Sequence, residues 1–504
     1  MECAMTYQTV RSTRLLSDTF EEKAFDGDFV LPDYLPEIAA ILSCELQPVI
    51  ENRQISGNRL TVDGTACVRV LYVDSSRCKI HCYETCQPFS AGFAADVLCE
   101  PALADVYTSV SYVNYRAIGP RRLDVRGAYR IHAKILDTVT MELPCDTTDS
   151  HIQLRQYTHN ESLPAESGEK IFAVNEVLDP GSNGNVASVV RAWAAASIAE
   201  CKVLSGRVIV KGDIALHTLY EPETENESPL YEECEHNLLY SQMLDVKGLE
   251  ESDSVITDVR VLSCDVHPET EEGTGKCVLI ANLRLALSLQ SWRQERSTFI
   301  TDAYSTEAPV QPETTERSCY RLLGSFDRRL PVRQQVELPE GVVDIVDLWC
   351  SCSPISRDGN VSNQRLQIHL LAKDENGSIV CYERSAEFPL ELPIMGNSPR
   401  FDVRVWECSY RVKEERQLEL NITVLVVGTD IHQDMQTVIT SLESEPAKAY
   451  AAPEATLKIV FAGKDESVWE IAKTCHVSAD RIREENRLSA DNLSEDTLLV
   501  IPMI

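Results

Sequence analysis

The side chains best suited to chemistry in this sequence are three cysteines and a histidine near residue 80. Cys78, His81, Cys82 and Cys86 follow one another with C-x2-H-C-x3-C spacing. Protein zinc sites favour cysteine pairs separated by two residues and held by a tight turn, and the chain contains no such pair. In a strand, Cys78 and Cys82 share one face while His81 takes the other. We therefore predict ordinary packing here and no metal site.

A second candidate is Gly273-Thr274-Gly275-Lys276, which is superficially similar to a phosphate-binding loop. That loop needs a further glycine, with four residues between, and a Ser or Thr directly after the lysine. Thr270 and Cys277 occupy those positions. The segment is predicted to be a polar hairpin turn without a nucleotide cofactor. Since the sequence also lacks a nucleophile elbow, H-E-x-x-H and paired-carboxylate motifs, we expect no enzyme activity.

Trp469 is the aromatic residue whose position suits recognition. It directly follows Val468 and precedes Ile471 by two residues. On a helix this spacing places the indole beside the apolar stripe rather than within it. Half-exposed aromatic side chains are frequent binding anchors. Two interpretations stay open, a contact with a partner and packing within the protein.

Charge restricts the classes of partner. The net charge is −32 over 504 residues, which disfavours nucleic acid and anionic membrane surfaces because both are bound through Lys and Arg. Residues 1–20 lack the apolar core of a secretory signal, and no apolar run reaches membrane-spanning length. We expect a cytoplasmic protein that meets other proteins, with its 18 cysteines mostly reduced.

The elements that must position these residues come from an internal repeat. A glycine-containing motif returns after about 150 residues, followed each time by Leu-Tyr and Tyr-Glu pairs. A divergent third copy keeps part of the pattern. The three copies are Ser56–Gly64 with Leu71-Tyr72 and Tyr83-Glu84; Ser205–Gly212 with Leu219-Tyr220 and Tyr231-Glu232; and Leu370–Asp374 with Tyr382-Glu383.

Each copy is predicted to consist of about seven short antiparallel strands. From Leu60 to Val70, apolar and polar residues alternate with the period of a half-buried strand. Asn376-Gly377 lies between two apolar runs, which is typical of a hairpin. Near the start we expect a strand at Tyr7–Arg14, an acidic connection at Asp18–Asp28 and a helical turn at Ile38–Leu42.

Composition sets the remaining boundaries. Val186–Glu200 is expected to form a short turn and then a strand, although its alanines favour a helix. Thr301–Arg317 and Leu442–Thr456 are rich in Pro, Glu, Thr or Ala, as in extended linkers. The predicted domains are β-units at 1–143, 150–300 and 318–441, and a small domain at 457–504.

The last domain reads as β-α-α-β. Leu457–Phe461 is a short strand, Ser467 and Glu470 form a capping box before a helix, Ser478 caps a second helix, and Leu498–Ile501 is a strand. The predicted fold is therefore mostly β, with three repeated antiparallel sandwich or sheet units before a small β-α-α-β domain.

This tail resembles the LysM family over Ile459–Ala472, Val477–Ile482, Glu485–Leu488 and Leu498–Pro502. The resemblance implies a groove between two loops, Gly463–Ser467 and Leu488–Leu493, which binds N-acetylglucosamine polymers in the family. Ser494–Thr497 replaces the usual Pro-Gly before the last strand. The partner-binding residues so implied, with Trp469 added, are Gly463, Lys464, Asp465, Glu466, Ser467, Trp469, Leu488, Asp491 and Asn492.

The repeat resembles the SPOCS domain of clostridial spore-coat proteins. The resemblance rests on Leu31-Pro32-Asp33, Pro36-Glu37-Ile38, the Gly57–Gly64 motif, Leu71-Tyr72 and Arg121–Val125. Tandem SPOCS domains before one LysM domain are the arrangement of SipL-like coat morphogenetic proteins. This implies a scaffold in the mother-cell cytoplasm, at the forespore surface, whose LysM domain binds the coat basement-layer ATPase, stage IV sporulation protein A. The alternative is an anchor that binds peptidoglycan.

Overall fold

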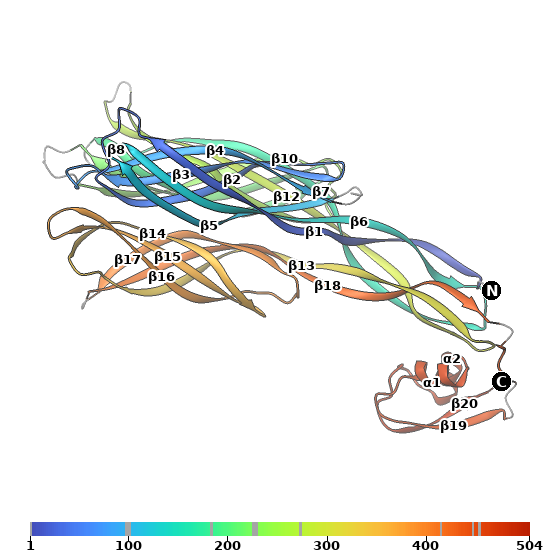
Figure 1. Cartoon of the computed structure of the whole chain (residues 1–504). Coiled ribbons are helices and arrows are strands. Elements are labelled where there is room, and N and C mark those ends of the chain that lie inside the picture. Colours follow the sequence, from blue (N-terminus) through green and yellow to red (C-terminus); the bar gives the residue numbers. More distant parts are fainter. Residues whose placement is uncertain are drawn as a thin grey trace.

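A computed structural model describes residues 3–95, 102–181, 185–223, 230–271, 275–413, 416–445, 448–451 and 455–503. The chain folds into three sets of six strands, followed by a small domain that contains both helices (Figure 1). The mostly-β prediction, with antiparallel units before a β-α-α-β domain, is confirmed. Each unit contains six strands rather than about seven. The two longest strands of each unit are continuous over lengths for which several short strands are predicted.

The first unit is built from two antiparallel sheets of three strands, with the orders β1-β6-β5 and β2-β3-β4. Buried residues alternate along β3, as the sequence predicts, and face residues of β6 such as Val125 and Ile131 across one core. The strands are β1 (Met5–Val30), β2 (Ala40–Ser56), β3 (Arg59–Val73), β4 (Ile80–Ala94), β5 (Leu103–Gly119) and β6 (Arg122–Thr147).

The second and third units repeat this layout. Their sheet orders are β11-β12-β7 with β10-β9-β8, and β13-β18-β17 with β14-β15-β16. The second unit contains β7 (Ile152–Leu178), β8 (Val186–Leu204), β9 (Arg207–Pro222), β10 (Glu232–Asp245), β11 (Ser254–Thr270) and β12 (Cys277–Ser305). The third contains β13 (Val310–Glu337), β14 (Val342–Asp358), β15 (Val361–Asp374), β16 (Ile379–Glu391), β17 (Arg400–Lys413) and β18 (Gln417–Ser444).

Two local predictions are wrong, and a third is wrong in part. Asp18–Asp28 is part of β1 rather than a connection, because this edge strand pairs with β6 and leaves its charged side chains at the surface. The helical turn at Ile38–Leu42 is replaced by the start of β2 at Ala40. For Val186–Glu200 the predicted strand, rather than a helix, is confirmed, but the short turn before it is absent because β8 pairs with β9 from Val186 onward. Strand pairing overrides local propensity at these sites, with the distant β6 for β1 and with the next strand of a hairpin for β2 and β8.

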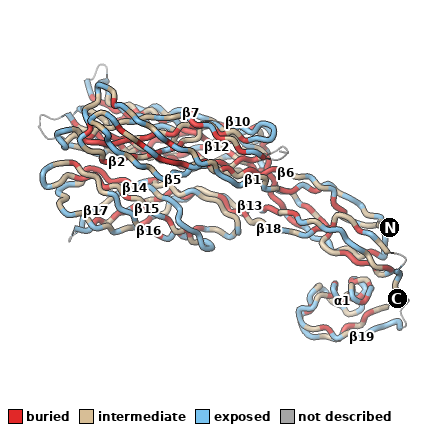
Figure 2. The backbone as a smooth tube through the Cα atoms, viewed as in Figure 1, coloured by how far each residue is buried: buried red, intermediate tan, exposed pale blue. Residues whose placement is uncertain are grey.

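The outer ends of the longest strand pairs leave the sandwiches and run together as a stalk (Figure 1). A buried apolar seam continues along it (Figure 2) and includes Phe299, Val438 and Ile439 from different units. We define the stalk as Met5–Leu15 with Leu136–Thr147, Ile152–Pro164 with Trp292–Ser305, and Val310–Leu322 with Ile431–Ser444.

The stalk overturns the linker prediction for Thr301–Arg317. Residues 301–305 end β12 and residues 310–317 begin β13, so only a short connection lies between them. The Pro, Thr and Glu residues of this segment suggest a solvated spacer, but Ala303, Tyr304 and Ala308 are buried. The other linker, Leu442–Thr456, begins inside β18, and residues 446–447 and 452–454 lie outside the described part.

The three units also join at their second sheets. Leu71, Leu219 and Leu371 come from equivalent positions of β3, β9 and β15, and all three are buried in one cluster. Leu42, Val190 and Val346 of β2, β8 and β14 belong to the same cluster. The three units therefore pack against one another as one body and are not independent domains joined by linkers. None of the helices in the described ranges has the length and apolar character needed to cross a membrane.

Candidate partner-binding site

The C-terminal domain places two helices against a pair of strands. β19 (Leu457–Ala462) pairs antiparallel with β20 (Thr497–Pro502), and α1 (Val468–Cys475) and α2 (Ala479–Asn486) lie between them in the sequence. Val468, Ala472 and Ile482 of the helices share a core with Leu499 and Ile501 of β20. The helical boundaries agree with the apolar spacing of the sequence.

The two loops of the predicted groove lie against each other. The first loop, Gly463–Ser467, is joined to the second loop, Leu488–Leu493, by main-chain hydrogen bonds. Asp465 N donates to Leu493 O at 2.9 Å, and Leu493 N donates to Glu466 O at 3.0 Å. Ser467 and Asn492 form an antiparallel bridge. These bonds pair main-chain groups of the two loops with each other.

Asp491 is the centre of this loop pair. Its carboxylate accepts hydrogen bonds from Ser467 Oγ at 2.8 Å, from the main-chain N of Trp469 at 3.2 Å and from Arg483 Nη2 at 2.9 Å. Burial raises the pKa of Asp491, but these bonds and the nearby guanidinium groups outweigh burial and hold the pKa below its ordinary value. An ionised carboxylate therefore ties the loops to the start of α1.

This arrangement corrects the capping-box prediction. Ser467 is the N-cap of α1, but its hydroxyl makes no hydrogen bond to the helix main chain. The carboxylate of Asp491 accepts the bond from the first turn instead. An anionic acceptor is favourable at a helix N-terminus, where unpaired N–H groups point outward. The helix start was predictable from local sequence, and its cap was not.

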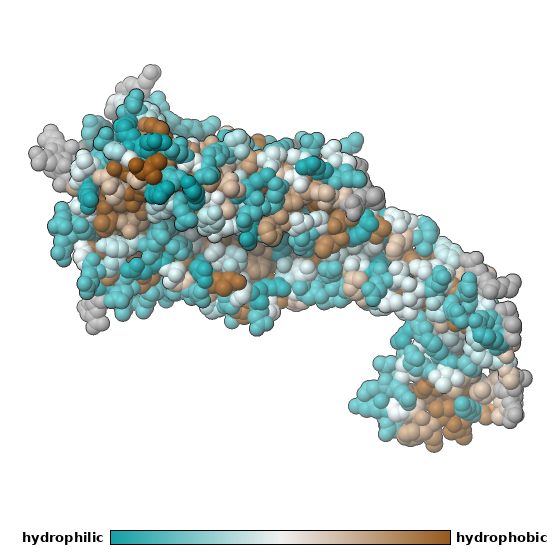
Figure 3. All heavy atoms as spheres, in the orientation of Figure 1, coloured by the Kyte–Doolittle hydropathy of each residue, from teal (hydrophilic) through white to brown (hydrophobic). Residues whose placement is uncertain are grey.

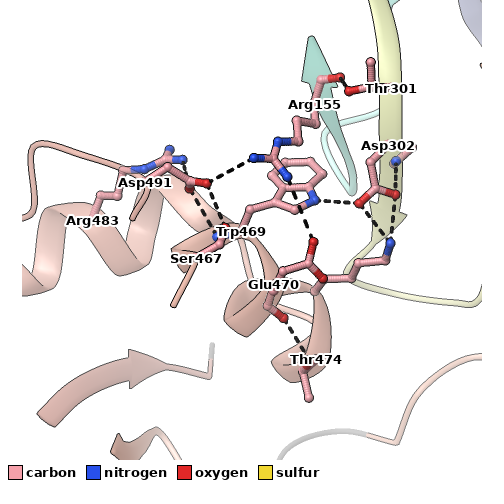
Figure 4. A network of polar contacts seen from close by, with 11 residues as sticks. Arg155, Thr301, Asp302, Ser467, Trp469, Glu470, Thr474, Arg483 and Asp491 are labelled. Atoms are coloured by element: carbon pink, nitrogen blue, oxygen red, sulfur yellow. Dashed lines mark hydrogen bonds and ion pairs between the residues drawn. The ribbon is translucent and has the colours of Figure 1, made fainter. Parts of the chain in front are cut away.

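Trp469 is buried against the stalk (Figure 4). The indole is 6% exposed and lies edge-on to Tyr304 of β12, with ring centroids 4.9 Å apart. Its Nε1 donates to Asp302 Oδ2 at 2.7 Å, and Lys473 Nζ contacts the same carboxylate at 2.8 and 2.9 Å. Of the two interpretations of Trp469, these contacts support packing within the protein.

Arg155 of β7 adds a second link between the stalk and the domain (Figure 4). Its guanidinium lies 3.6 Å from the carboxylate of Asp491 and 4.0 Å from that of Glu470. Tyr304 OH also donates to the main-chain oxygen of Val477 at 2.7 Å. The helix side of the domain thus faces the stalk, and Arg155, Asp302 and Tyr304 are site residues that sequence reasoning missed.

The predicted partner-binding residues fall into two groups. Lys464, Asp465, Glu466 and Asn492 have exposed side chains on the loop pair. The others are wholly or partly covered: Gly463, Ser467, Trp469, Leu488 and Asp491. The structure brings the loop residues together at one end of the domain, and it separates Trp469 from them by turning its ring toward β12.

The cysteine–histidine segment is not assembled into a metal site. Cys86 forms a disulfide with Cys67 across β3 and β4, and His81 lies 3.2 Å from Asp74. Among the described residues, the one gathering of His, Cys, Asp or Glu ligand atoms within 4.8 Å is Cys67, Glu84 and Cys86, of which two are in that disulfide. Cys67 and Cys86 are thus exceptions to the expected reduced state. Gly273 and Thr274 of the phosphate-loop candidate lie outside the described residues.

Comparison with protein families gives two matches. The model of the SipL, SPOCS domain family matches residues 37–118 and 185–269, which span most of β2–β5 and of β8–β11. The LysM domain model matches residues 463–502. Neither is a catalytic domain family.

The third unit repeats the sheet orders of the first two without a family match of its own. No curated protein and no solved structure matched the chain. The family matches nevertheless agree with the two better preserved copies of the motif and with the tail. The chain therefore carries two SPOCS domains of the SipL type and a C-terminal LysM domain, the combination found in SipL-like sporulation proteins.

Proposed function

We propose that this protein is a non-enzymatic scaffold of the spore coat. Its LysM domain binds the coat basement-layer ATPase, stage IV sporulation protein A, in the mother-cell cytoplasm at the forespore surface. The SPOCS and LysM matches support a sporulation role. The three β-units join through buried leucines into one body, which suits a part that holds a binding domain in place.

One observation favours a protein partner over a glycan. The only tryptophan of the LysM domain is turned into the stalk, where its indole N–H is bonded to Asp302. Recognition of sugar rings commonly uses an exposed aromatic face together with free polar groups. Here the indole is covered, and several main-chain groups of the two loops bond to each other.

The second candidate is an anchor that binds peptidoglycan. It is favoured by the match of residues 463–502 to the LysM family, whose members bind such polymers. It is also favoured by the exposed side chains of Lys464 and Asn492 on the loop pair.

A pair of binding assays separates the two candidates. Full-length protein and a chain lacking residues 457–504 are tested against purified stage IV sporulation protein A and against sedimented cell walls. We expect the full chain to bind the ATPase, the truncated chain to lose binding, and neither to sediment with cell walls. Sedimentation with cell walls, without ATPase binding, would support the anchor instead.

Point variants localise the contact. The double change Lys464→Ala and Asn492→Ala removes two exposed side chains. The hydrogen bonds between the loops join main-chain atoms of neighbouring residues, such as Asp465 N to Leu493 O, and do not need these side chains. We expect it to weaken ATPase binding at least tenfold, which corresponds to about 1.4 kcal/mol. Lys247→Ala, at an exposed position between β10 and β11, is the matched control and should bind like the natural protein.

A further inference from the structure

The strand pair of the LysM domain is apolar on both of its faces. One face packs on the helices through Val460, Leu499 and Ile501. The opposite face carries three cross-strand pairs, and every member is apolar: Leu457 with Pro502, Ile459 with Val500, and Phe461 with Leu498. We call these six residues the apolar face. An antiparallel sheet with one side in water ordinarily alternates apolar and polar residues, so this face departs from the pattern.

The apolar face is largely uncovered. Leu457, Ile459, Phe461 and Leu498 are 55%, 69%, 68% and 66% exposed. Figure 3 shows hydrophobic atoms gathered on the side of this domain that points away from the stalk. The contacts of Trp469 and Arg155 hold the helix side against the stalk, which leaves the apolar face turned outward.

From this geometry we propose that the apolar face is a docking surface for a second protein, which presents an apolar patch bordered by Lys and Arg. The proposal rests on the proposed function and adds a second contact beside the loops. Exposed apolar patches bordered by polar residues mark interaction sites. The face offers no polar side chain to sugar hydroxyls, so it suits a protein rather than a glycan.

Charge at the border indicates the partner's chemistry. At the end of the patch formed by Phe461 and Leu498, the chain continues into the first loop and into Ser494–Thr497, where Lys464 N donates to Asp496 Oδ1. Four exposed acids lie in Gly463–Ser467 and Ser494–Thr497 against one exposed lysine: Asp465, Glu466, Glu495 and Asp496, with Lys464. A basic border on the partner would complement them.

The same charges disfavour the other occupants. A second copy of the chain would bring another net charge of −32 to the interface, and like charges in close proximity oppose association. An anionic lipid surface would be repelled for the same reason. The occupant is therefore a different protein with a neutral or positive contact surface.

The test uses the full chain with Ile459→Thr and Phe461→Thr together. Threonine keeps strand propensity, and an unchanged melting curve with an unchanged circular dichroism spectrum verifies the fold. Leu239→Thr, at a 74% exposed leucine on β10, is the matched control. The probe is purified stage IV sporulation protein A. We expect the double variant to bind at least tenfold more weakly and the control to bind as the natural chain does.

A charge variant tests the border. Glu495→Lys should weaken binding severalfold at low salt and reduce the salt dependence of affinity. If the natural chain binds and the double threonine variant binds equally well, the docking surface is overturned while the proposed function stands. If the natural chain does not bind the probe at all, the proposed function fails and this inference fails with it.

Two further experiments test the other possible occupants, a second copy of the chain and a lipid surface. Light scattering compares the oligomeric state of the natural chain with that of the double variant, and flotation uses phosphatidylglycerol vesicles. We expect the same monomeric mass for both proteins and no flotation. Self-association or vesicle binding that the double variant abolishes would overturn the proposal of a different protein partner.

Discussion

The indole Nε1 of Trp469 donates to Asp302 Oδ2 at 2.7 Å, which fastens the LysM domain to the last strand of the second unit. Lys473 adds charge to the same carboxylate. The two contacts share one acceptor group, so Asp302 holds the domain through both Trp469 and Lys473, beside the further links from Arg155 and Tyr304. The orientation of both the loops and the apolar face therefore depends on Asp302.

Changing Asp302→Ala should release the LysM domain from the stalk. The indole N–H and the ammonium group would lose their acceptor inside a partly buried contact, which costs about 1–3 kcal/mol. We expect faster proteolytic cleavage between the stalk and the domain, and a larger radius of gyration in small-angle scattering. Asp302→Asn keeps an acceptor without the charge and should give an intermediate result. Equal protection of all three proteins would contradict the clamp.

The glycine of the repeated motif should tolerate no larger side chain. A Cβ added to Gly64 would lie 2.2 Å from Val49 O, and one added to Gly212 would lie 2.0 Å from Ser197 O. Gly64→Val and Gly212→Val should each lower the free energy of unfolding by about 1–3 kcal/mol or more, because the strands are forced apart. Chemical denaturation measures this.

Gly324→Val is the matched control for the glycine variants. Gly324 lies in β13, and a Cβ there meets no atom within 4 Å. Its effect should stay within about 0.5 kcal/mol. Equal destabilisation at Gly64 and Gly324 would show that close strand approach at Gly64 does not explain the motif.

Much of the strand layout could be read from alternation. Leu60, Val62 and Val68 follow a period of two and are buried as that period predicts. Asp18–Asp28 shows the limit, because an acidic edge strand carries no apolar stripe and is defined by its pairing with β6. Tyr304 shows it again, since a buried side chain in a segment rich in Thr and Glu depends on neighbours far along the chain.

The candidate site likewise has a part that the sequence predicts and a part that it does not. The LysM helices and loops rest on spacing within about fifty residues, which sequence patterns capture well. The contact of Trp469 with Asp302 spans 167 residues and has no local signature. The sequence leaves open whether Trp469 packs within the protein or contacts a partner, and it gives no sign of Asp302 as the group it meets.

The junction of the three units should respond strongly to cavity formation. Leu371 is fully buried beside Leu71 and Leu219, where equivalent positions of the repeat meet. Leu371→Ala should cost about 2–5 kcal/mol through lost burial and the remaining cavity. Calorimetry should show separate transitions for the units in place of one. Leu239→Ala, at an exposed leucine, should leave the trace unchanged, and a similar change in both variants would contradict a shared junction.

Inside the stalk, strands from all three units meet at one buried carboxyl group. Glu161 of β7 is fully buried and forms an ion pair with Arg317 of β13. Its Oε1 also accepts a hydrogen bond from Thr13 N of β1 at 3.1 Å. Burial raises the pKa of Glu161 to about 7, although Arg317 opposes the rise.

This shift predicts that stability falls as pH rises. An acid whose pKa is raised by folding keeps its proton in the folded protein after the unfolded chain has lost it. Glu161 therefore contributes fully below its ordinary pKa of 4.5, and the contribution is lost as pH approaches about 7. The slope should not exceed about 1.4 kcal/mol per pH unit. Glu161→Gln should remove this part of the slope in urea titrations from pH 4.5 to 7, whereas Glu387→Gln, at an exposed ion pair, should retain it. An unchanged slope in Glu161→Gln would mean that Arg317 keeps the carboxylate of Glu161 ionised throughout this pH range. The pair would then link the strands as an ion pair, without a protonated carboxyl group.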